Sequence, residues 1–168
     1  GGIDDQSFNA GSWSGLLKAE KELSIAKPKY VASHEQNDYT VNLASLAEKG
    51  NDLVIGVGFM MEDAIADAAK SHPNTKFAII DGKVPDGLKN ALSLKFKEEE
   101  GSFLAGYLAA KVSKKGSIGF IGGVESPLIT KFEVGYIAGA RTANPAVKVI
   151  AKYVGNWTDN AKGQQMAS

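Results

Sequence analysis

The hydrophobic positions of this chain alternate between two patterns, helical spacing and short continuous apolar runs. Residues 8–23 repeat apolar side chains at helical spacing, whereas residues 52–58 form an unbroken apolar run typical of a strand buried on both faces. The predicted helices cover residues 8–23, 38–50, 61–71, 102–112, 130–144 and 158 onward. The predicted strands cover residues 29–33, 52–58, 76–81, 91–96, 117–121 and 147–154.

Alternating strands and helices with short connections predict right-handed βαβ units, an α/β fold class and parallel sheets flanked by helices. The first helix has no strand before it, and the last helix has only begun at Ser168. We therefore expect a fragment whose first strand lies upstream of Gly1. The Gly135-x-x-x-Gly139 spacing predicts close packing of its helix against a sheet.

Cap residues define several of the predicted helix starts. Asp4 or Asp5 is placed to cap the first helix, and Asp38 the second. Thr130 and Glu133 have the spacing of a capping box, which predicts a helix start at that point.

Composition narrows the possible functions. The 168 residues include 19 Lys+Arg and 19 Asp+Glu, so the formal net charge is zero and no basic field favours nucleic acid as a partner. No apolar run reaches the roughly 20 residues that span a bilayer. The absence of cysteine excludes thiol catalysis, cysteine-ligated zinc and disulfides, but leaves the compartment open.

Motifs for catalysis, metals and cofactors are missing from the sequence. There is no P-loop, nucleophile elbow or His-Glu-x-x-His, and Met61 stands where a dinucleotide fingerprint after Gly56-x-Gly58 needs glycine. His34 and His72 lie in separate loops, so neither is expected to act as a base or as half of a metal pair. We predict no catalytic residues, no metal and no cofactor.

Ligands of open α/β sheets bind at the carboxyl ends of the strands, where four side chains stand out. Phe8 either plugs the sheet end or stacks on a planar ligand. The Asn9 side chain either hydrogen-bonds the edge of a ligand, as both donor and acceptor, or caps a backbone group. Phe59 is a cleft wall or a staple for the next helix, and Asp81 binds ribose hydroxyls or caps its turn.

Several stretches together resemble the basic membrane lipoprotein family, purine nucleoside receptor-like substrate-binding proteins of ABC importers. The likeness runs through essentially the whole chain. The matching stretches are Asp4–Asn9, Asp52–Phe59, Lys76–Asp81, Phe96–Ala110, Ile118–Gly123, Gly135–Ala140 and Asp159–Gly163.

The resemblance implies a type I periplasmic-binding-protein fold with two hinged lobes and a nucleoside held between them. Residues 1–96 would form the first lobe without its first strand, residues 97–100 the hinge crossing, and residues 101–168 the beginning of the second lobe. The resemblance places a second stacking ring and the ribose contacts beyond Ser168.

The resemblance also implies roles for individual residues. The ring at Phe8 would stack on the purine, and Asn9 would face the base. Asp5, from the same motif, together with Phe59 and Asp81 completes the expected ligand-binding set.

The function expected from the resemblance is nucleoside binding for an ABC importer, without catalysis. Its partners would be a purine nucleoside and the permease subunits. The protein would sit on the extracytoplasmic face of the cell membrane through a lipidated N-terminus that is not in this chain. Two alternatives use the same scaffold: a nucleoside- or sugar-processing enzyme, or the ligand-sensing domain of a regulator. The enzyme would need a water-activating carboxylate cluster or a metal site, for which the Asp4–Asp5 pair is the only candidate.

Overall fold

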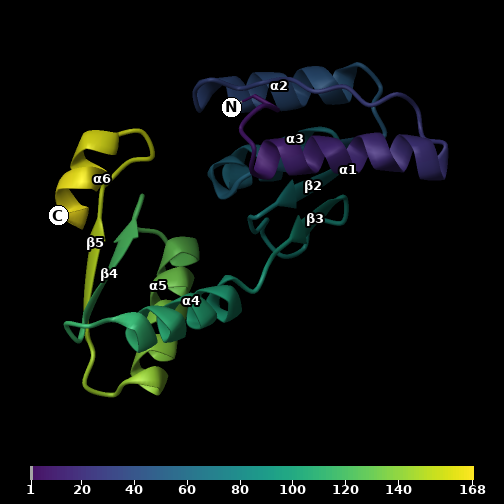
Figure 1. Cartoon of the computed structure of the whole chain (residues 1–168). Helices are drawn as coiled ribbons and strands as arrows, with labels where there is room; N and C mark the ends of the chain where they lie inside the picture. The colour runs from purple at the N-terminus through teal and green to yellow at the C-terminus, as the bar shows by residue number, and fades with distance from the viewer. Residues whose placement is uncertain (1) are drawn as a thin grey trace. The chain divides into compact units, whose positions relative to one another are not determined.

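The computed structural model describes residues 2–168, which divide into two compact units, the first ending at Phe96 and the second beginning at Lys97 (Figure 1). The first unit contains α1 (Phe8–Leu23), α2 (Asn37–Glu48), β1 (Leu53–Val57), the 3₁₀ turn η1 (Phe59–Met61), α3 (Glu62–Ser71), β2 (Lys76–Ile80) and β3 (Ala91–Leu94). The second contains α4 (Glu98–Val112), β4 (Ser117–Gly122), α5 (Pro127–Ala143), β5 (Lys148–Tyr153) and α6 (Asn160–Ala167).

A parallel three-stranded sheet in the order β1-β2-β3 organises the first unit. The apolar run in β2 buries Phe77 and Ile79 almost completely, and Ile65 of α3 is fully buried in the same core. The continuous apolar pattern of β2 therefore does correspond to a strand buried on both faces. For residues 52–58 the same prediction is wrong: β1 buries Val54 and Gly56 on one face, whereas Leu53 on the other face is 52% exposed. The predicted α/β class with parallel strands and flanking helices is confirmed.

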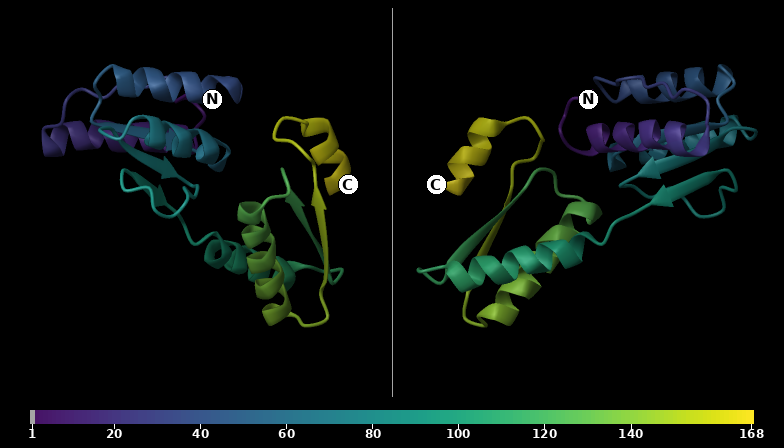
Figure 2. Two further views of the ribbon diagram at one scale, coloured as in Figure 1. Left: turned by 180° about the vertical axis from the view of Figure 1, so that it is seen from behind. Right: turned by 45° about the vertical axis from the view of Figure 1, so that its right-hand side comes forward.

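The second unit pairs β4 with β5 in parallel, and its helices α4 and α5 cross each other in direct contact (Figure 2). A Cβ atom on Gly139 would collide with the backbone carbonyl of Phe103, and one on Gly106 with the carbonyl of Tyr136. The prediction that the Gly135-x-x-x-Gly139 stretch packs against a sheet is therefore wrong. These glycines let the backbones of two helices approach each other.

Residues 29–33, predicted as a strand, have no regular secondary structure. A strand needs a hydrogen-bonded neighbour, and among residues 2–168 no strand pairs with this segment. Side-chain contacts hold it instead: the Tyr30 ring packs edge-on against Trp13 with centroids 5.3 Å apart, and the Asn42 amide donates to the Ser33 hydroxyl at 3.0 Å.

Two helices, α4 and α5, begin about one turn earlier than predicted. Helix α4 starts at Glu98 rather than Ser102, because the run Glu98–Glu100 forms an acidic first turn that suits the helix dipole. Helix α5 starts at Pro127 rather than Thr130, with the Ser126 hydroxyl accepting from the Ile129 amide at 3.3 Å. The expected capping box thus lies inside α5.

The prediction that Asp38 caps α2 is wrong, because Asp38 lies inside the first turn of that helix. Its carboxylate instead accepts from the amides of His34 (2.7 Å) and Glu35 (3.2 Å) in the preceding turn. None of the helices within residues 2–168 is both long enough and apolar enough to cross a bilayer. Over the same residues, no three His, Cys, Asp or Glu side chains gather where they could hold a metal.

Candidate functional site

The strands of the first unit end in register, which brings the residues after them to one edge of the sheet. Val57 pairs with Ile80, and Ile80 with Leu94. The ladder continues past these ends: the Gly58 amide donates to Ile80 and the Asp81 amide to Leu94, both at 2.8 Å. Residues 58–59, 81 and 95–96 therefore follow three adjacent strand ends.

The start of α1 is fixed by Asp5, whose carboxylate accepts from the backbone amides of Ser7 (3.0 Å), Asn9 (3.0 Å) and Ala10 (2.9 Å). These N–H groups, above all that of Ala10, lower the pKa of Asp5, against a smaller opposing effect of desolvation. Both carboxylate oxygens are engaged by the backbone. Asp5 is thus the cap that sets the position of Phe8, the first residue of the helix.

Phe8 lies at the same edge as the strand ends. Its residue surface is 47% exposed, and its ring meets the Phe96 ring edge-on with centroids 6.0 Å apart. The reading of Phe8 as a buried plug is therefore wrong. Phe96, 53% exposed just beyond β3, was not selected from the sequence, although an aromatic residue two positions after a strand was a usable signal.

The remaining predicted residues of the first unit are half-buried at or near the strand ends. Asn9 follows Phe8 in α1, and Phe59 opens the 3₁₀ turn after β1. Asp81 has φ +61°, a left-handed conformation that Asp tolerates better than most residues but which is still strained. Ligand contact by Asp5, Phe8, Asn9, Phe59 and Asp81 stays a prediction.

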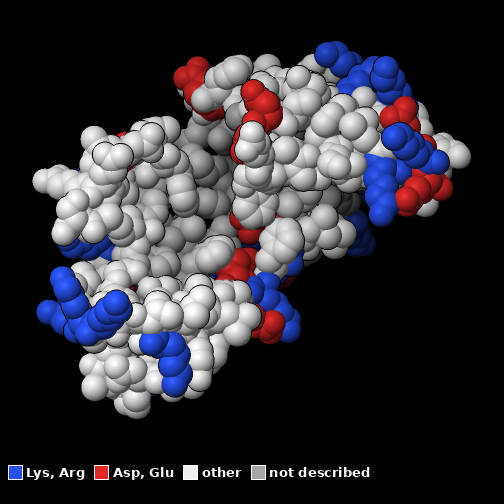
Figure 3. All heavy atoms as spheres, viewed as in Figure 1, with Lys and Arg blue, Asp and Glu red and all other residues white. Residues whose placement is uncertain are grey.

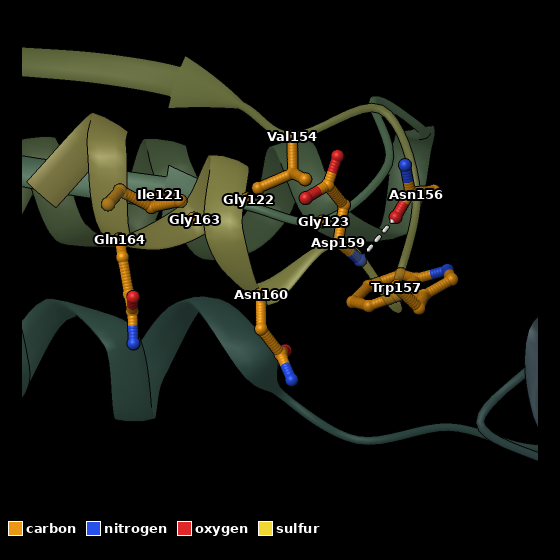
Figure 4. Close-up of a pocket in the computed structure, with 10 residues that line it drawn as sticks. All are labelled: Ile121, Gly122, Gly123, Val154, Asn156, Trp157, Asp159, Asn160, Gly163 and Gln164. Carbon is orange, nitrogen blue, oxygen red and sulfur yellow. Dashed lines mark hydrogen bonds between the residues drawn. The ribbon is translucent and has the colours of Figure 1, made fainter.

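The second unit has a cavity of about 450 Å³ at the carboxyl ends of β4 and β5 and the start of α6 (Figure 4). It is lined by Ile121, Gly122, Gly123, Val154, Asn156, Trp157, Asp159, Asn160, Gly163 and Gln164. Trp157 is 50% exposed and is the one aromatic residue of the lining, which otherwise consists of glycines, polar residues and the aliphatic Ile121 and Val154.

Hydrogen bonds fix the loop that carries Trp157. The Asn156 side-chain oxygen accepts from the amides of Thr158 (3.0 Å) and Asp159 (2.8 Å), and the latter bond is drawn in Figure 4. Asp159 in turn caps α6 by accepting from the Lys162 amide at 2.9 Å, which confirms the helix start predicted there. The oxygen of Asn156 is therefore committed to the loop, and its N–H groups are the atoms suited to a ligand.

Trp157 was not selected from the sequence. The segment Gly155–Asp159 was recognisable as a loop after a strand end, so the position of the ring was available as a signal. An aromatic residue within a polar loop is the same pattern that marked Phe8.

Tyr153, the last residue of β5, pairs with Gly122, one of the residues that line the cavity. Its hydroxyl donates to the Glu133 carboxylate of α5, and its ring lies 6.3 Å from that of Phe120. The hydrogen bond to Glu133, followed by burial, raises the pKa of Tyr153. This pair ties the end of β5 to α5.

Charge is distributed in small groups of both signs over the face drawn in Figure 3, with broad uncharged areas between them. This distribution agrees with a formal net charge of zero. The aromatic rings, rather than a charged field, are the distinctive features of the candidate site.

Comparison with known proteins identifies relatives of the whole chain. The family model described as ABC transporter substrate-binding protein, PnrA-like, matches residues 1–168. The ABC transporter nucleoside-binding protein BmpA of Lactococcus lactis subsp. cremoris is 41% identical over 170 residues, which cover 99% of this chain and 48% of that protein. The chain thus spans about half the length of this curated relative.

Solved structures share the fold. A solute-binding protein of an ABC transporter system from Aeropyrum pernix matches with a TM-score of 0.86 at 27% identity, over 99% of this chain and 48% of its own. A transcriptional activator of the comK gene from Bacillus halodurans matches with a TM-score of 0.73 at 22% identity, over 95% of this chain and 54% of its own. The second likeness concerns the fold alone.

Proposed function

Because the chain belongs to the PnrA-like family of ABC transporter substrate-binding proteins, we propose that it binds a nucleoside for delivery to an importer. The name of the Lactococcus relative, a nucleoside-binding protein, supports this ligand class. Proteins of this family are binding proteins and not enzymes.

One observation supports the proposal most strongly: each unit carries an exposed aromatic ring at the carboxyl ends of its parallel strands. The exposed ring is that of Phe8 in the first unit and that of Trp157 in the second. Stacking on a flat base is worth roughly 1–3 kcal/mol per base, which suits a ligand held without covalent chemistry. We assign stacking on the base to Phe8, and we assign to Trp157 an additional aromatic contact beside the stacking ring that the resemblance places beyond Ser168. A purine offers the larger flat surface.

In this proposal the two units are the lobes of a hinged receptor, and residues 97–100 are the hinge crossing. Ligand would favour the closed form only through contacts made in that form. Asn9 would hydrogen-bond the base, Asp81 the ribose, and Phe59 would line the cleft. Asp5 would act by holding Phe8 in place through its cap on α1.

The enzyme alternative is not favoured. Its candidate base, Asp5, has both carboxylate oxygens occupied by backbone amides and a lowered pKa, which makes it a poor proton acceptor. The sensor alternative is not favoured either, since the transcriptional activator shares only the fold at 22% identity.

We further propose that the protein works on the extracytoplasmic face of the cell membrane, held by a lipidated N-terminus, and that ABC permease subunits are its partners. The family assignment supports this placement. Labelling intact cells with a membrane-impermeant reagent tests it, since labelling only after lysis would contradict it.

Calorimetric titration of the intact protein with inosine, guanosine and adenosine tests ligand binding. Phe8→Ala should weaken affinity at least about tenfold, the loss of roughly one stacking contact. Leu23→Ala is the matched control, because Leu23 is 71% exposed at the opposite end of the same helix. Absence of nucleoside binding would overturn the function, whereas unchanged affinity in Phe8→Ala would remove only Phe8 from the site.

A further inference from the structure

We propose that Gly123 is a positioning residue, whose missing side chain seats the Trp157 ring at the wall of the second unit's cavity. The inference rests on the proposed function for its effect on affinity, although the seating itself does not. Gly123 follows the last residue of β4, and Trp157 belongs to the loop after β5.

The contact between the two residues is direct. A Cβ atom on Gly123 would overlap the Cε3 and Cζ3 atoms of Trp157 and lie 2.9 Å from its Cδ2 atom. All three are atoms of the indole ring system, so the ring rests against the Gly123 backbone. Any side chain at position 123 must displace the ring.

The backbone cannot easily move away to make room. The Val154 amide donates to the Gly122 carbonyl at 2.9 Å, and the Gly155 amide to the Gly123 carbonyl at 2.7 Å. These bonds extend the β4–β5 ladder up to the contact. The side-chain oxygen of Asn156 then holds the loop on the far side of Trp157. A clash at Gly123 is therefore expected to act on the indole ring.

The neighbouring Gly122 makes room for a different ring, that of Tyr153. A Cβ on Gly122 would lie 2.5 Å from Cε1 and 2.6 Å from Cδ1 of Tyr153, whose hydroxyl is bound to Glu133 of α5. Successive residues of a strand face opposite sides. Gly122 thus accommodates a ring on the helix side, and Gly123 accommodates the ring that lines the cavity.

Nucleoside titrations of Gly123→Ala test the consequence for binding. We expect affinity to fall roughly tenfold, comparable to losing one stacked ring. Gly119→Ala is the control, because Gly119 lies in β4, the strand that leads to Gly123, but outside the cavity, and its Cβ would meet nothing closer than 3.9 Å. Gly123→Ala should add no further loss in a Trp157→Ala background, since both changes act through one ring.

Two ligand-free measurements test the seating itself. In a Trp13→Phe background, Trp157 is the only tryptophan among these 168 residues, and Gly123→Ala should raise its quenching by acrylamide while Gly119→Ala should not. If Gly123→Ala lowers the melting temperature of the parent protein, it should not lower the melting temperature of a Trp157→Ala variant, because the clashing ring is then absent.

The outcomes separate the two proposals. The role of Gly123 would be overturned if acrylamide quenched Trp157 equally in Gly123→Ala and in Gly119→Ala. It would also be overturned if the affinity losses of Gly123→Ala and Trp157→Ala added fully in the double variant. Failure of every nucleoside to bind the parent protein would overturn the proposed function, and would leave the quenching and melting results to decide the seating.

Discussion

The two units bury their interiors in different ways. The first unit fills its core with large side chains, since Phe77, Ile79 and Ile65 are nearly inaccessible between the sheet and its helices. The second buries few large side chains and instead brings the backbones of α4 and α5 together at glycines such as Gly106 and Gly139. The first unit should therefore be sensitive to lost volume, and the second to added volume.

Despite this difference, each unit presents an exposed ring at the carboxyl ends of its strands. Phe8 is held in position by the cap that Asp5 makes on α1. Trp157 is held by the contact of its ring with Gly123 and by the Asn156 side chain, which accepts a hydrogen bond from the Asp159 amide of the same loop. The position of a site in an α/β unit is thus set by topology, while the local means of holding a ring varies. One tryptophan in each unit, Trp13 and Trp157, allows the units to be followed separately.

The largest effect is expected from Phe77→Ala, which leaves a cavity in the first unit. Removing a buried phenylalanine costs about 3–5 kcal/mol of unfolding free energy. Denaturant unfolding followed by Trp13 in a Trp157→Phe background measures it. Leu92→Ala, at a neighbouring strand position that is 61% exposed, should change stability by less than about 0.5 kcal/mol. Equal losses in the two variants would contradict the side-chain core.

The second effect is expected from Gly106→Ala, which should destabilise the second unit by about 1–3 kcal/mol or more through overpacking against the Tyr136 backbone. Gly101→Ala is the control in the same helix, since its Cβ would meet nothing within 4 Å. That control should be neutral or stabilising by about 0.5–1 kcal/mol. Trp157 fluorescence in a Trp13→Phe background reports both, and a Gly106→Ala variant as stable as Gly101→Ala would refute the close helix contact.

A smaller effect is expected on the unfolding free energy of the first unit at acid pH. The pKa of Asp5 is lowered in the folded state, so its contribution is present above pH 3.8 and is lost as pH falls through its folded pKa. Asp5→Asn should flatten this part of the acid unfolding curve followed by Trp13. A variant whose curve keeps the slope of the parent would show that the cap is not made.

The smallest effect lies at high pH in the second unit. Because the pKa of Tyr153 is raised above 10.0, its contribution is present below pH 10.0 and is lost as pH rises through the folded pKa. Tyr153→Phe should remove this alkaline dependence of Trp157-detected unfolding. Persistence of the full dependence in that variant would speak against the Tyr153–Glu133 hydrogen bond.

Local patterns predicted much of the fold. The apolar runs of β1 and β2 and the capped starts of α1 and α6 were recognisable, because each depends on residues close together in sequence. Residues 29–33 failed as a strand because pairing requires a distant neighbour. The glycines of α5 indicated close packing, but the partner helix α4 is not visible in a local pattern.

The candidate site was only partly predictable for the same reason. Phe8 stood out as an aromatic residue in a polar helix start, and the structure gives it 47% exposure. Its neighbour Phe96 and the seat of Trp157 on Gly123 depend on contacts across the sheet, which no single stretch encodes.

The most direct test of the central claim is a crystal structure of the intact protein with inosine bound. The account predicts that the base stacks on the Phe8 ring of the first unit and that the ligand also contacts the Trp157 ring of the second. A base that touches neither ring, or that binds away from the carboxyl ends of the strands, would contradict it.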